Sequence, residues 1–152
     1  MLQVGAQAPE VAGRDQYGAP FAAEAVLSTQ ALLLVFFPWV FSDICGGELR
    51  ALRDALPDFA TAGVEVVGVS CDAMFSQRVW ADSEQLGFRI VSDHWPHGDI
   101  ARSYAVFDDH VGVALRGTFL IDQAGILRWS IVRGIGEPRS VDEQLAAARA
   151  LG

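Results

Sequence analysis

Two largely apolar runs constrain the fold of this chain more than any other feature of its sequence. The first, ALLLVFF, spans residues 31–37, and the second, VEVVGVSC, spans residues 64–71. The first run is continuously apolar, which is typical of a strand in a sheet that is covered on both faces, and the second is interrupted only at Glu65 and Ser70. The segment between them has the helical spacing of apolar residues at Leu49, Leu52 and Leu56. The pattern therefore predicts two buried strands separated by a helix.

The rest of the chain continues this alternation. The first 20 residues are rich in Gly and Pro and favour loops and short strands. The predicted order is β-α-β-α-β-α-β-β-α, which fits an α/β thioredoxin-like fold with an N-terminal extension, a mixed central sheet flanked by helices. We expect a single domain over residues 1–152. Helices are expected at residues 42–55, 75–86, 100–104 and 140–151; Pro57 stops the first of them and Gly87 ends the second. Further strands are expected at residues 88–93, 112–122 and 125–133.

Composition and charge exclude several classes of function. The net charge of −8 argues against a nucleic-acid partner and against adhesion to an anionic membrane. The longest apolar run, residues 31–41, is much shorter than the roughly 20 residues of a spanning helix. The start, MLQVGAQAPE, lacks the features of a signal peptide, so we expect a cytoplasmic protein with reduced thiols. Two cysteines cannot form a disulfide framework.

One of these cysteines, Cys45, lies at the predicted start of a helix. Ser42 is a favourable N-cap, and Cys45 is then the third helical residue, where unpaired N–H groups and the helix dipole favour a thiolate. Pro38 ends the strand and can shield the site from water. Gly46 and Gly47 either leave room for a substrate or allow this turn to unwind. The alternative, an inert core cysteine, would gain nothing from a helix N-terminus.

Pro38, Ser42 and Cys45 match the P-x-x-x-[TS]-x-x-C motif of the peroxiredoxins. Four further segments resemble the family in the right order: GAQAPE, GVSCDAMFSQRVWAD, LRGTFLID and PRSVDEQL. The segment SDHWPHGDIARSYAVF and the early chain end are most similar to the alkyl hydroperoxide reductase E type, a one-cysteine peroxiredoxin.

The resemblance implies a thiol peroxidase without a cofactor, in which Cys45 attacks a peroxide oxygen and becomes a sulfenic acid. The implied substrates are hydrogen peroxide and organic hydroperoxides, with peroxynitrite as a further candidate. Arg116 would hold the thiolate and the peroxide, and Ser42 would bond a peroxide oxygen. The family positions matching Glu48 and Arg139 orient and extend this arginine network.

Cys71 is predicted to be a buried strand cysteine, because it ends the second apolar run and no resolving-cysteine motif is present. Cys45 would then act alone and need an external thiol. The resemblance implies mycothiol or another low-molecular-weight thiol, or a glutaredoxin- or thioredoxin-like protein, and a homodimer. The open alternative is a redox sensor or interaction protein in which Cys45 is oxidised slowly. No metal site is predicted, because His94 and His97 with Asp93 lack further ligands at recognisable spacing.

Overall fold

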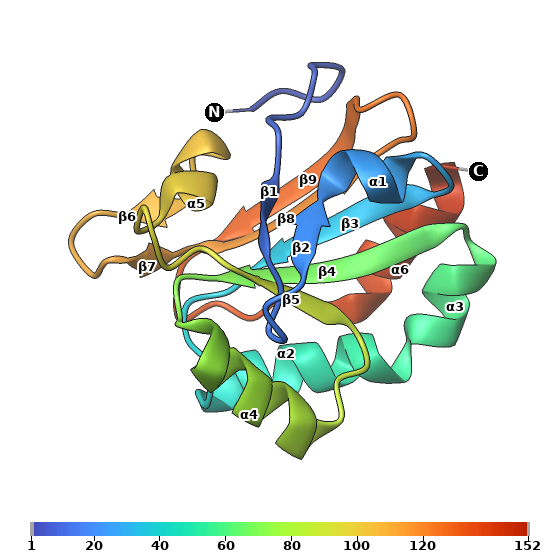
Figure 1. Cartoon of the computed structure of the whole chain (residues 1–152). Coiled ribbons are helices and arrows are strands. Elements are labelled where there is room, and N and C mark those ends of the chain that lie inside the picture. The colour runs from blue at the N-terminus through green and yellow to red at the C-terminus, as the bar shows by residue number, and fades with distance from the viewer. Residues whose placement is uncertain (1, 152) are drawn as a thin grey trace.

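The structure is a computed structural model, and it describes residues 2–151. Strands and helices alternate along most of the chain (Figure 1). The strands are β1 (Ala12–Arg14), β2 (Pro20–Ala22), β3 (Ala31–Phe36), β4 (Val64–Ser70), β5 (Arg89–Ser92), β6 (Phe107–Asp108), β7 (Val113–Ala114), β8 (Arg116–Ile121) and β9 (Leu127–Arg133). The helices are α1 (Ala23–Leu27), α2 (Asp43–Asp54), α3 (Leu56–Thr61), α4 (Met74–Glu84), α5 (Asp99–Ser103) and α6 (Val141–Leu151).

The central sheet has five strands in the order β5-β4-β3-β8-β9. β3, β4 and β5 are parallel, whereas β8 pairs antiparallel with both β3 and β9. The predicted α/β fold with a mixed sheet is therefore confirmed. The two apolar runs of the sequence form the central pair, β3 and β4, and every residue of β3 is buried.

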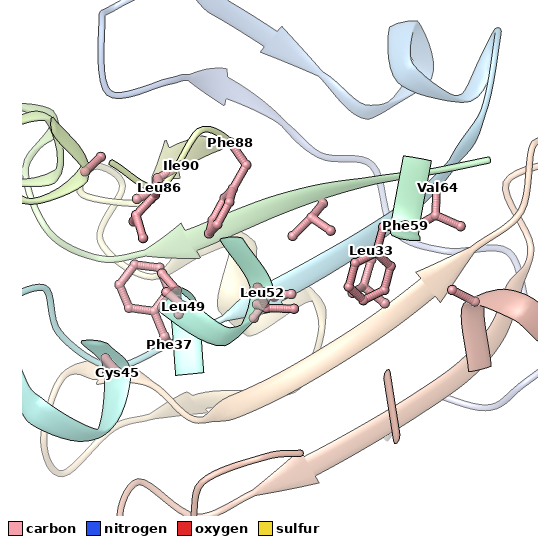
Figure 2. Close-up of a cluster of buried hydrophobic side chains, with 14 of the residues drawn as sticks. Leu33, Phe37, Cys45, Leu49, Leu52, Phe59, Val64, Leu86, Phe88 and Ile90 are labelled. Atoms are coloured by element: carbon pink, nitrogen blue, oxygen red, sulfur yellow. The ribbon is translucent and has the colours of Figure 1, made fainter. Parts of the chain in front are cut away.

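Alternate residues of β3, with Phe37 just after it, contribute to two separate hydrophobic clusters, one on each face of the sheet. Leu33, Val35 and Phe37 pack with residues of α2, α3, α4 and α6 on one face of the sheet. Figure 2 shows part of this cluster, with Cys45 at one end of it. Leu32 and Leu34 point to the other face, which is covered by β1, β2, α1 and α5 (Figure 1). Burial on both faces explains why β3 reads as one continuous apolar run.

The topology brings two distant segments to one edge of the sheet. The parallel strand β3 ends at Phe36, and a short loop leads from it to α2, which begins at Asp43. Because β8 runs antiparallel to β3, its first residue, Arg116, lies beside the end of β3. The start of α2 and the start of β8 therefore face each other, although they lie about seventy residues apart in the sequence.

Three local expectations need correction. Pro57 follows the end of α2 as expected, but it also lies in the first turn of a further helix, α3, because Pro suits that position. The predicted strand 112–122 is interrupted at Leu115, where pairing changes from β6 to the central sheet. Helix α1, which has only five residues, was not predicted from the sequence. Within residues 2–151, no helix is both long and apolar enough to cross a membrane.

Candidate active site

Helix α2 begins at the predicted residue. Ser42 has the extended backbone of an N-cap, and its Oγ accepts a hydrogen bond from the Cys45 N–H at 3.2 Å. The predicted cap is therefore confirmed. Cys45 lies in the first turn, with its side chain buried at the end of the core cluster (Figure 2). Its sulfur thus sits where the positive end of the helix dipole favours an anion.

Arg116 reaches this sulfur from the other side of the site. Its Nη1 atom lies 3.3 Å from Cys45 Sγ and 2.6 Å from Glu48 Oε1. Its Nε donates to the carbonyl oxygen of Ile135 at 2.6 Å, which fixes the plane of the guanidinium. The arginine is only 1% exposed, so these contacts form in a medium that screens charge weakly.

Glu48 lies between two arginines. Arg139 binds its carboxylate through Nε at 3.0 Å, Nη2 at 3.0 Å and the backbone N–H at 2.6 Å. Burial by itself raises the pKa of the Glu48 carboxyl, but the hydrogen bonds and charge of Arg139, joined by the charge of Arg116, outweigh burial and hold the pKa below its ordinary value. Glu48 therefore stays ionised and orients both guanidinium groups.

The charges of the buried cluster leave room for one more anion. Arg116 and Arg139 carry two positive charges, and Glu48 carries one negative charge. A buried net charge is costly unless it is paired. A thiolate at Cys45, in hydrogen-bond reach of Arg116, would complete the balance. Arg116 is thus the charged group of this cluster that lies next to the Cys45 sulfur.

Two further residues belong to the network and were missed in the sequence. Thr118 Oγ1 accepts from Arg139 Nη1 at 3.2 Å and donates to Gln144 Oε1 at 2.9 Å. Thr118 lies two residues after Arg116, so strand alternation places both side chains on one face of β8. That spacing could have identified Thr118. Gln144 depends on how α6 docks against the sheet, which carries no local signal.

The loop before α2 completes the surroundings of the sulfur. Pro38, two residues after the end of β3, is buried. Trp39, Phe41 and Ile44 are 40%, 59% and 39% exposed, so apolar side chains project around the start of α2. The structure thus brings all six residues singled out in the sequence, Pro38, Ser42, Cys45, Glu48, Arg116 and Arg139, to one edge of the sheet.

Cys71 has different surroundings. It directly follows β4 and is 5% exposed. Burial, together with the nearby carboxylates of Asp93 and Asp72, raises the pKa of the Cys71 thiol to about 12. Its sulfur lies 4.0 Å from Asp93 Oδ2. Both cysteines are free thiols in this structure, and these surroundings disfavour a Cys71 thiolate.

The residues that were weighed as a metal site do not form one. In the part of the chain that the structure describes, no group of three or more His, Cys, Asp or Glu side chains could hold a metal ion. His94 and His97 instead have ring nitrogens within 3.3 Å of backbone carbonyl oxygens.

Comparisons with known proteins agree with this geometry. The model of the AhpC/TSA family matches residues 4–130. The chain is 39% identical over 139 residues to alkyl hydroperoxide reductase E of Mycobacterium tuberculosis, covering 91% of each protein.

Two solved structures share the fold. The peroxidoxin BcpB of Mycobacterium tuberculosis superposes with a TM-score of 0.90 at 25% identity, over 100% of this chain and 99% of the other. The reduced 2-Cys peroxiredoxin of Plasmodium vivax gives a TM-score of 0.89 at 27% identity, over 99% and 82% of the two chains. The chain therefore belongs to the AhpC/TSA family, the peroxiredoxins, which are thiol peroxidases.

Proposed function

We propose that this chain is a one-cysteine thiol peroxidase in which Cys45 reduces hydrogen peroxide and organic hydroperoxides, with peroxynitrite as a further substrate. The observation that carries the proposal is the position of Arg116 Nη1, 3.3 Å from Cys45 Sγ and 2.6 Å from Glu48 Oε1. A buried arginine in this place serves both the attacking sulfur and the oxygen that leaves.

The first step transfers one oxygen atom. The Cys45 thiolate attacks the terminal, hydrogen-bearing oxygen of ROOH, an S–O bond forms, and the O–O bond breaks. The departing RO⁻ takes a proton from solvent water and leaves as water or an alcohol, while Cys45 becomes a sulfenic acid. Negative charge moves from sulfur to the departing oxygen, so donors must face both positions in the transition state.

This chain has donors available for that purpose. Within residues 2–151, Arg116 Nη2 makes no hydrogen bond, so it is available to a peroxide oxygen. The Ser42 hydroxyl accepts from the Cys45 N–H and retains its own proton to donate. Glu48 and Arg139 hold Arg116 in place, and Pro38 limits access of water. We assign catalytic roles to Cys45, Arg116 and Ser42, and supporting roles to the other three.

Recycling requires a thiol from outside the chain. The sulfenic acid condenses with one external thiol to give a mixed disulfide and water, and a second thiol releases Cys45 and leaves as the oxidised reductant. The burial and raised pKa of Cys71 argue against it as the resolving residue. By similarity to the E type, the reductant would be mycothiol or another small thiol, or a glutaredoxin- or thioredoxin-like protein.

The apolar side chains around the start of α2 support organic hydroperoxides as substrates. Trp39, Phe41 and Ile44 together offer a surface that favours an apolar R group over a charged one.

In the same proposal, residues 1–152 act as one domain that forms a homodimer in the cytoplasm.

The first test is to mix the reduced protein with sub-stoichiometric hydrogen peroxide in a stopped-flow instrument. Tryptophan fluorescence gives the rate, mass spectrometry identifies the product, and Cys45→Ser is the control. We expect fast, stoichiometric sulfenic acid on Cys45 with Cys71 free. A rate equal to that of a free thiol would instead favour the redox-sensor function, and a Cys45–Cys71 disulfide would overturn the one-cysteine mechanism.

A further inference from the structure

The loop from Pro38 to Phe41, which links β3 to the proposed peroxidatic helix, has few anchors of its own. Pro38 has no N–H, and within residues 2–151 the only backbone N–H of this loop that forms a hydrogen bond is that of Val40. The bond runs to Asp72 Oδ2 at 3.0 Å. A carboxylate from the segment after β4 therefore holds the middle of the loop.

The loop also ends in a conformation that needs support. Phe41, the residue before the Ser42 cap, has φ of +67°, which non-glycine residues rarely adopt. Such a backbone conformation is strained for a residue with a side chain and persists only where its surroundings enforce it. Phe41 is 59% exposed, and its ring lies 6.5 Å from that of Trp80 in α4. Its own side chain is thus only partly fixed by packing.

The carboxylate that holds Val40 is itself held by buried groups. Asp72 Oδ2 accepts from Ser70 Oγ at 2.7 Å, and Ser70 Oγ accepts from Gln77 Nε2 at 2.9 Å. Ser70 and Gln77 are fully buried, and Gln77 Nε2 also donates to the carbonyl oxygen of Val91. Ser92 Oγ donates to the Asp72 carbonyl oxygen at 2.7 Å. A continuous chain of bonds thus connects α4 and the ends of β4 and β5 to Val40.

We propose that Asp72 is a positioning residue for the active site, which fixes the Pro38–Phe41 loop through the Val40 N–H and thereby sets the place of Ser42 and Cys45. It touches no reacting atom in this assignment. The inference rests on the proposed peroxidase function only for its kinetic consequence. Because misplacement of reacting groups by about 1 Å can cost about 100-fold in rate, a loosened loop should slow the attack on peroxide.

The test combines amide hydrogen exchange at Val40 with the rate of Cys45 oxidation by hydrogen peroxide. In the wild-type protein, we expect the Val40 amide to be protected. Asp72→Ala should reduce this protection by about 10-fold or more and slow oxidation by about 10- to 100-fold. Asp72→Asn keeps an oxygen that can accept from both Val40 N–H and Ser70 Oγ, so it should restore the rate to within about threefold of the wild type.

The matched control is Asp58→Ala. Asp58 lies in α3, before β4, with an exposed carboxylate 3.8 Å from Arg149, and its loss should change neither readout. An unprotected Val40 amide in the wild-type protein would overturn the proposal even if Asp72→Ala does not fold. So would an Asp72→Ala protein that oxidises at the wild-type rate. If the wild-type rate equals that of a free thiol, the peroxidase proposal fails, whereas Val40 exchange still decides the role of Asp72.

Discussion

Glu48 and Arg139 are joined by three hydrogen bonds of 2.6–3.0 Å, one of them from the Arg139 backbone N–H. The backbone bond ties the loop just before α6 to α2. Since Glu48 also binds Arg116, one carboxylate connects α2, β8 and the loop before α6. The orientation of the proposed catalytic arginine therefore depends on a residue that need not touch the substrate.

Replacing Glu48 by Gln should destabilise the protein. The change leaves two buried guanidinium groups without their shared anion, and loss of one partner of a buried ion pair typically costs about 3–5 kcal/mol. Urea unfolding of the two proteins would measure the difference. The control is Glu84→Gln, which removes the partly exposed partner of Arg50 and should cost about 0–1 kcal/mol. Equal losses in the two variants would contradict a special role for the buried cluster.

The same carboxylate should make stability depend on pH in acid. Folding lowers the pKa of Glu48, so the unfolded state binds a proton at this carboxyl more readily than the folded state does. The ionised carboxylate therefore stabilises the folded state fully above the ordinary pKa of about 4.3. It should be lost as the pH falls from there through the lower folded-state pKa. Urea unfolding between about pH 7 and about pH 3 should show this loss in the wild type and a smaller loss in Glu48→Gln. Parallel curves would show that other groups dominate.

Arg116→Ala should slow peroxide reduction more than any effect on ionisation can explain. An ordinary thiol is about 3% ionised at pH 7, so complete loss of thiolate stabilisation costs at most about 30-fold. The rest of the loss should come from the missing donors to the transferring oxygen. The second-order rate constant and the ultraviolet absorbance of the thiolate, measured on the same sample, separate the loss of ionisation from the loss of donors to the transferring oxygen. A rate that only follows the ionised fraction would contradict the assignment.

The sequence predicts the local half of the site well and the distant half less well. The cap and the helix start follow from a few neighbouring residues, because an apolar strand must end before a polar N-cap can begin a helix. The complete burial of Cys45 was not predicted. Arg116 was identified only through the resemblance of LRGTFLID to the family. No local rule predicts that a strand residue about seventy positions away points at Cys45.

The missed features have a common physical reason. Thr118 and Gln144 meet only because α6 docks against β8, and the Val40 contact of Asp72 depends on how the loop after β3 returns to the end of β4. Each of these roles depends on a hydrogen bond between residues that are far apart in the sequence. Such a bond can be identified only when the relative positions of the two backbone segments are known. The split of the predicted strand at Leu115 is similar, since it depends on which neighbour each half pairs with.

Ser42→Ala should affect both folding and rate. Loss of the N-cap bond to Cys45 should cost about 0.5–2 kcal/mol of stability, and loss of a hydroxyl at the proposed peroxide site should slow oxidation by about tenfold or more. Ser42→Thr keeps the hydroxyl and should retain most of the stability and most of the oxidation rate. Ser140→Ala is the matched control, because Ser140 Oγ caps α6 by accepting from the Glu143 N–H. A similar rate loss in Ser140→Ala would assign the effect to stability alone.

Cys71→Ala should leave peroxide oxidation of Cys45 unchanged. With a pKa raised to about 12, almost none of the Cys71 thiol is ionised at pH 7, and the thiolate is the form that would attack a sulfenic acid. The wild type and the variant should therefore reach the same Cys45 sulfenic acid at rates within about twofold, and Cys71 of the wild type should react with an alkylating reagent only after unfolding. Mass spectrometry of the trapped products tests both points. A sulfenic acid that survives longer in Cys71→Ala than in the wild type would show that Cys71 resolves it, and that its burial is relieved once Cys45 is oxidised.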